Sequence, residues 1–252
     1  MGTLPTTIVA PEKPQLSQPQ RIINTFIDPV KTFTDLRRGT AWWMAWIFVA
    51  LFSIGYAATV DTKIGFDQAM ANQMKLASAK QLENIEKMPA DQRAKMMSIQ
   101  VTVMKIISYG FPILSLVIMV ITAALLMATF RFGTGADVTF GASLAVVVYA
   151  HLPGIFRAIL GIVTIFAGKD PESFYIENPV ATNLGYFLDP LQHKAFYTLG
   201  SYVDVFSIWI LVLTAIGFSC VTKVKRGTSY GIVFGLYAFV ALVHTGFAAL
   251  MS

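Results

Sequence analysis

Five long apolar stretches divide the chain and determine its predicted architecture. Apolar runs occupy positions 39–60, 106–130, 205–222 and 227–252, and a fifth, at 138–168, is interrupted only by His151 and Arg157. A helix needs about 20 apolar residues to cross the hydrocarbon core of a bilayer. The pattern therefore predicts an all-α, polytopic integral membrane protein with five transmembrane helices, at about 40–60, 104–130, 138–167, 199–222 and 228–250.

The polar segments carry helical signals of their own. Residues 1–20 are polar and proline-rich, which is typical of a disordered tail. From 21 to 38, apolar residues recur at helical spacing among basic ones, which predicts an N-terminal interfacial amphipathic helix. Asp28 and Pro29 fit an N-cap and a first helical position, so this segment should break into two short helices. Residues 61–103 predict an extramembrane helical hairpin, with a capping box at 78–81 and a helix that starts at Pro89 and runs into the second span.

Charge refines this picture and gives an orientation. Of the residues, 55% are hydrophobic and 13% charged, an apolar excess too large for an ordinary soluble domain. The net charge of +5 comes without a basic stripe of interleaved aromatics, so no nucleic-acid partner is predicted. Basic residues are concentrated in short segments on the N-terminal side of the membrane and diluted by acids in the longer loops on the other side. The N-terminus is therefore predicted to be cytoplasmic.

A candidate intramembrane polar network is formed by four side chains within the predicted spans: His151, Arg157, Asp204 and His244. Such groups usually face a bundle interior or a cavity. Arg157 in the third span and Asp204 in the fourth should lie at similar depth, and structural pairing is favoured over a polar cavity or an ion path. His244 has no obvious local partner and is interpreted as a structural histidine. Two histidines are too few for a metal site, so neither a metal nor a cofactor is predicted.

Two backbone features also stand out in the spans. Pro153 frees the carbonyl of Tyr149 one turn earlier, and with Gly154 beside it a structural kink is predicted in the third span. A ridge of small residues on the last helix lets another backbone approach closely. Packing within the bundle is the favoured interpretation of this ridge, and homo-oligomerisation is the alternative. Its members are Gly227, Gly231 and Gly235.

The order of these parts resembles the Yip domain family, the membrane proteins named for interaction with Ypt/Rab GTPases, and especially its bacterial-type branch. Residues 26–38, which precede a tryptophan-rich first span, resemble the helix that leads into the membrane in that family. The run Tyr149-Ala150-His151-Leu152-Pro153 resembles its central tyrosine-to-proline signature. Five spans with a cytoplasmic N-terminus also match, and the resemblance covers residues 21–250.

The resemblance implies a membrane domain without known catalysis. No phosphate-binding loop, zinc-protease helix, nucleophile elbow or kinase signature is present, so an enzyme is not expected and no residue is assigned as catalytic. The first hypothesis is a non-enzymatic adaptor or scaffold in membrane organisation, trafficking or a membrane protein complex. It would reside in a bacterial inner membrane, or in an endomembrane if the source is eukaryotic. Its partners would be the lipid bilayer and another membrane protein or a second copy.

Two further expectations concern partners and transport. Eukaryotic family members carry an Asp-Leu-Tyr-Gly-Pro type motif that is absent from this sequence, so binding of a small GTPase is not carried over. The alternative function is a small transporter or channel, or an accessory subunit of one. It would use the intramembrane histidine, arginine and aspartate side chains.

Overall fold

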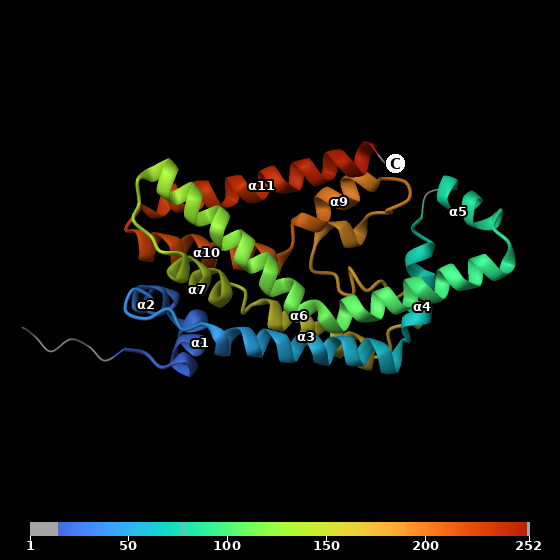
Figure 1. The fold of residues 1–252 in the computed structure, drawn as a ribbon, viewed down its shortest axis with the longest axis horizontal. Helices are drawn as coiled ribbons and strands as arrows, with labels where there is room; N and C mark the ends of the chain where they lie inside the picture. The colour runs from blue at the N-terminus through green and yellow to red at the C-terminus, as the bar shows by residue number, and fades with distance from the viewer. Residues whose placement is uncertain (1–14, 78, 251–252) are drawn as a thin grey trace, which may run out of the picture.

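A computed structural model describes residues 15–77 and 79–250, and in this part of the chain the elements are helical (Figure 1). They are α1 (Gln18–Ile27), α2 (Pro29–Asp35), α3 (Trp43–Lys63), α4 (Phe66–Met74), α5 (Ala79–Glu86), α6 (Ala90–Thr134), α7 (Phe140–Ala150), α8 (Gly154–Phe166), the 3-10 turns η1 (Pro171–Ser173) and η2 (Leu184–Phe187), α9 (Lys194–Tyr202), α10 (Val205–Thr222) and α11 (Arg226–Leu250). Among the described residues, five segments are long and apolar enough to span a membrane: α3, α6, α7 with α8, α10, and α11. The predicted fold class is confirmed.

Two helix pairs form the body of the bundle. α3 packs on α8, and α10 packs on α11, while α6 crosses diagonally between α3 and α11 in Figure 1. The α6–α7 and α10–α11 connections lie at the same end as α1 and α2. We call this the basic end, because Arg37, Arg131, Lys223, Lys225 and Arg226 belong to these segments. The opposite end, where α4 and α5 lie, is the hairpin end.

The N-terminal segment folds as two helices. Ser17 caps α1, since its hydroxyl accepts from the Gln20 N–H while its own N–H donates to the Gln20 side chain. Residues 18–20, predicted as part of a disordered tail, are therefore helical, residues 15–17 have no regular secondary structure, and residues 1–14 lie outside the described chain. The predicted break at Asp28–Pro29 is present, and Asp28 Oδ1 accepts from the Lys31 N–H at 3.2 Å.

A buried ion pair fixes these two helices. Arg21 Nε and Nη2 donate to Asp35 Oδ2 at 2.9 and 2.8 Å, and the two side chains are only 1% and 8% exposed. The same carboxylate oxygen accepts from the Leu16 N–H, and Arg21 Nη1 donates to the Ala41 carbonyl at the start of α3. An arginine on a free amphipathic helix would extend into water or headgroups. Residues 21–38 are instead folded back onto the bundle, and their position at a bilayer surface stays a prediction.

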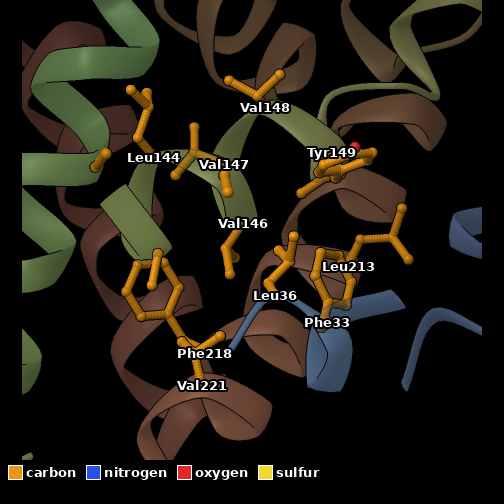
Figure 2. Close-up of a cluster of buried hydrophobic side chains, with 14 of the residues drawn as sticks. Phe33, Leu36, Leu144, Val146, Val147, Val148, Tyr149, Leu213, Phe218 and Val221 are labelled. Atoms are coloured by element: carbon orange, nitrogen blue, oxygen red, sulfur yellow. The ribbon is translucent and has the colours of Figure 1, made fainter. Parts of the chain in front are cut away.

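α2 completes the main hydrophobic core (Figure 2). Phe33 and Leu36 are fully buried and meet apolar side chains of α7 and α10 in that cluster. The contact depends on Gly217 in α10, where a Cβ would lie 2.4 Å from Val146 Cγ1 and 3.1 Å from Phe33 Cδ1. α7 itself is buried from Ala142 to Ala150, as a helix that is apolar on every side requires.

The third span is broken at its centre. α7 ends at Ala150 and α8 begins at Gly154, so the kink predicted at Pro153 is a turn of three residues between two helices. α7 packs on α6 and α10, whereas α8 packs mainly on α3. The two halves of this span therefore contact different helices, α7 the α10 side of the bundle and α8 the α3 side. The Tyr149 hydroxyl, just before it, donates to the Ala41 carbonyl at 3.1 Å.

α6 is much longer than a bilayer requires. Its 45 residues correspond to about 67 Å at 1.5 Å per residue, against a hydrocarbon core of about 30 Å. It begins directly after Pro89 and continues through Pro112, as predicted for a helix that runs into the second span. α4 packs against it and is joined to η1, because the Asn72 amide donates to the carbonyls of Pro171 and Phe174. The predicted capping box at 78–81 includes Ser78, which lies outside the described residues.

The fourth span is shorter than predicted. It was expected to begin at 199, but α9 ends at Tyr202 and α10 begins at Val205. Asp204 separates them in extended conformation, and its carboxylate accepts from the Ser207 N–H at 2.9 Å as the N-cap of α10. An N-cap aspartate starts a new helix rather than continuing an old one.

The Arg21–Asp35 pair gives a direct test of how the N-terminal helices are held. Asp35→Ala should lower the free energy of unfolding by about 3–5 kcal/mol, because Arg21 would remain buried without a counter-charge. Denaturation in detergent, followed by circular dichroism, measures the loss. Asp137→Ala is the control, since it removes an exposed carboxylate 3.7 Å from Arg131 and should change stability little. Equal effects of the two substitutions would contradict the structural role of the buried pair.

Candidate functional site

The candidate site lies where α10 begins, at the hairpin end of the bundle. α10 has 18 residues and its neighbour α11 has 25, so α11 continues past the start of α10. α9 packs beside this part of α11 (Figure 1), and η2 packs on α9. α9 and η2 pack backbone to backbone, because a Cβ on Gly200 would lie 2.8 Å from the Gly185 nitrogen. A segment made of a short helix and a 3-10 turn thus lies beside the part of α11 that continues past α10.

An ion pair between α8 and α10 is the centre of the site. Arg157 Nη2 donates to the Asp204 carboxylate and, at 3.1 Å, to Ser207 Oγ. This is the pairing predicted from the similar depth of the two residues. The Asp204 side chain is only 3% exposed and its Oδ2 also accepts from Thr182 Oγ1 at 2.6 Å. The Arg157 side chain is 42% exposed, and its Nε is buried without a partner.

The environment of Asp204 favours its charged form. Burial opposes ionisation, but hydrogen bonds from Thr182 and Ser207 and the charge of Arg157 outweigh it and lower the pKa of the Asp204 carboxyl. The residue is therefore a carboxylate at neutral pH whose oxygens are already occupied by donors. The remaining hydrogen-bonding capacity of the pair belongs to the guanidinium, which has five N–H donors.

A polar cavity of about 380 Å³ surrounds the pair. Besides Arg157, Asp204 and Ser207, it is lined by hydroxyl, amide and imidazole groups from α9, α11 and the segment before η2. His244 Nδ1 lies 3.0 Å from the Tyr202 hydroxyl, and the Tyr237 hydroxyl donates to the Tyr202 carbonyl at 2.8 Å. His244 therefore has a partner 42 residues away, which local sequence could not reveal.

The structure divides the predicted four-residue network. Arg157, Asp204 and His244 line one cavity, but His151 does not. His151 Nδ1 lies 2.7 Å from the Val147 carbonyl, within the turn that breaks the third span. Its position is explained by the helix break: the ring satisfies a carbonyl of the last turn of α7. Sequence reasoning missed Tyr202, Tyr237 and Thr182, which come from segments with no motif.

The predicted packing of the glycine ridge within the bundle is wrong for the described chain. A Cβ on Gly227, Gly231 or Gly235 would meet no atom within 4 Å. α11 faces α10 through other residues, among them buried Ser229, whose hydroxyl donates to the Ala215 carbonyl at 2.6 Å. The glycines lie on the opposite, exposed face, and homo-oligomerisation through them stays a prediction.

The cavity lining offers charged and hydrogen-bonding groups to a ligand. Within the described ranges, no three His, Cys, Asp or Glu side chains gather as they would around a metal ion. The cavity brings together one ion pair, several hydroxyls and amides, and one imidazole. Such convergent polar groups in a concave site orient a ligand.

Replacement of Asp204 tests the ion pair. Asp204→Ala should lower the free energy of unfolding by about 2–3 kcal/mol, because α10 loses its cap and Arg157 loses its counter-charge while staying half-exposed. Because the folded-state pKa is lowered, this contribution is present above the ordinary carboxyl pKa of about 3.9 and disappears as the pH falls below it. The free energy of unfolding is measured at pH 7 and at pH 3, and the difference between wild type and variant should be smaller at pH 3. A difference that does not change with pH would contradict the ionised pair.

Comparison with known proteins gives one match. The model of the Yip1 domain matches residues 23–250, which include α2, the broken third span and the polar cavity. No curated protein and no solved structure matches the chain. The match covers most of the sequence and agrees with the five membrane-spanning segments. The chain therefore belongs to the Yip1 domain family.

Proposed function

We propose that this protein is a non-enzymatic adaptor or scaffold in membrane organisation, trafficking or a membrane protein complex. The Yip1 family is generally non-enzymatic, which supports a role in binding rather than catalysis. We place the basic end in the cytoplasm of a bacterial cell and the five spans in its inner membrane. The support for this orientation is the concentration of arginine and lysine in the short connections at that end.

The observation that carries the proposal is the length of α6. About 20 residues suffice to cross the bilayer, and the remainder of the 45-residue helix continues beyond it without interruption. Its first turns and α5 form an arm at the hairpin end (Figure 1). Because one helix belongs to both the bundle and the arm, a partner bound to the arm is coupled rigidly to the membrane domain. Leu82 and Ile99 are exposed apolar side chains on this arm, among charged and amide side chains.

Affinity purification tests the arm as the contact surface. Wild-type protein purified in mild detergent should recover a stoichiometric membrane-protein partner, identified by mass spectrometry. The double variant Leu82→Glu with Ile99→Glu should reduce this recovery about tenfold, because two charges are placed on the apolar part of the arm. Asn84→Glu with Gln92→Glu adds the same charge at exposed polar positions of the arm and should retain the partner. Repeated recovery of a partner-free monomer would count against an adaptor.

A second function, a small transporter or channel or an accessory subunit of one, is favoured by one observation. The cavity collects Arg157, Asp204 and His244, and ionisable groups at membrane depth often belong to solute paths. A carrier of this kind should show solute flux into liposomes that falls several-fold in Asp204→Asn and in Arg157→Gln. Liposomes that leak equally with and without the protein would exclude this function.

A further inference from the structure

The polar cavity is bordered by a surface suited to acyl chains. Tyr237, one of its lining residues, lies close to the midpoint of α11, so the cavity reaches well into the span. His244 lines the cavity, and its helical neighbours Val240, Val243 and Phe247 are exposed apolar side chains. Within a bilayer such side chains contact lipid tails. Polar groups and a lipid-facing surface therefore adjoin each other on one helix.

The charges of the lining select the kind of ligand. Arg157 is paired with Asp204, and Glu177 adds a second carboxylate from the exposed segment before η2. The formal charges of Arg157, Asp204 and Glu177 sum to one negative charge, which disfavours a ligand that is itself anionic. The Arg157 Nε is buried, but the side chain is 42% exposed, so its exposed N–H groups can donate to phosphate oxygens, which guanidinium groups bind well.

The other side of the cavity suits an ammonium group. The Glu177 carboxylate is exposed at the cavity, with the Gln73 amide at 3.4 Å as a weak donor. Three tyrosines, Tyr197, Tyr202 and Tyr237, also line the cavity. The faces of aromatic rings attract organic cations. A group that carries both a phosphate and an ammonium would fit this lining, with the phosphate at Arg157 and the ammonium at Glu177 and the tyrosines.

We propose that this cavity binds the headgroup of a zwitterionic phospholipid, with the phosphate at Arg157, the ammonium toward Glu177, and the acyl chains along the exposed apolar side chains of α11. A volume of about 380 Å³ lies in the range of small-ligand pockets and accommodates a phosphoethanolamine group. The proposal does not depend on the adaptor function, since it needs no protein partner.

Lipid retention measures this preference directly. The full chain is reconstituted with equal amounts of phosphatidylethanolamine and phosphatidylglycerol, and the lipids kept after transfer to detergent are counted by native mass spectrometry. The wild type should retain phosphatidylethanolamine over phosphatidylglycerol. Glu177→Gln removes the carboxylate that faces the ammonium and should shift this ratio about fivefold toward phosphatidylglycerol.

Glu172→Gln is the matched control, because it makes the same change in the same connecting segment but outside the cavity lining, and it should keep the wild-type ratio. Arg157→Gln should lower retention of both lipids. If the Arg157→Gln variant does not fold, Glu177→Gln still tests the proposal. Equal retention of the two lipids by wild type, or an unchanged ratio in Glu177→Gln, would overturn the proposal.

Competition with soluble phosphoethanolamine shows whether the ligand is a membrane lipid or a water-soluble compound with the same headgroup. Acyl chains add apolar contact along α11, so the soluble compound should displace the bound lipid only at concentrations at least about a hundredfold above those of the lipid. Displacement at equal concentration would identify a water-soluble ligand and overturn the lipid assignment.

Discussion

The buried contact of Arg21 with Asp35 is the interaction on which the basic end of the structure depends. It joins α1 to α2, and Arg21 also reaches the Ala41 carbonyl at the start of α3. The Tyr149 hydroxyl donates to the same carbonyl. The segment before the first span and the run at the break of the third span that resembles the family signature therefore meet at one backbone oxygen, through Arg21 and Tyr149. A buried ion pair contributes little net stability, but it fixes geometry, because either charge alone would be strongly destabilising.

A second ion pair has the corresponding role at the other end. α10 is seven residues shorter than α11, so a polar segment lies beside the end of α11. The backbone groups of this segment need hydrogen-bond partners at that depth. The Leu184 and Val205 N–H groups donate to the Val203 and Thr182 carbonyls. Asp204 joins this segment to the bundle, because it caps α10, accepts from the Thr182 hydroxyl and pairs with Arg157. Between the two pairs, the break at His151–Pro153 moves the third span from the α10 side to α3. The polar cavity is a consequence of this arrangement.

Signals read over short distances in the sequence correctly located several of these features. The break at Asp28–Pro29, the helix start at Pro89 and the kink at Pro153 follow from the restrictions that proline places on the backbone. The contact of Arg157 with Asp204 followed from depth, because both spans are fixed by the length of an apolar run. The burial of Arg21 and the Tyr202 partner of His244 did not follow, since these contacts depend on how separate helices dock.

The number of spans follows from the length of the apolar runs, and the breaks at Asp28–Pro29 and Pro153 follow from proline and capping residues, which act within one or two turns. The tertiary structure decided which faces meet. It put Phe33 and Leu36 of the segment at 21–38 into the core, left Gly227, Gly231 and Gly235 exposed, and separated His151 from the other ionisable residues. The physical reason is that the lipid surrounding the spans is as apolar as most of their side chains. Burial of an apolar face therefore does not choose a partner helix, and close packing at Gly217 and a few polar contacts do.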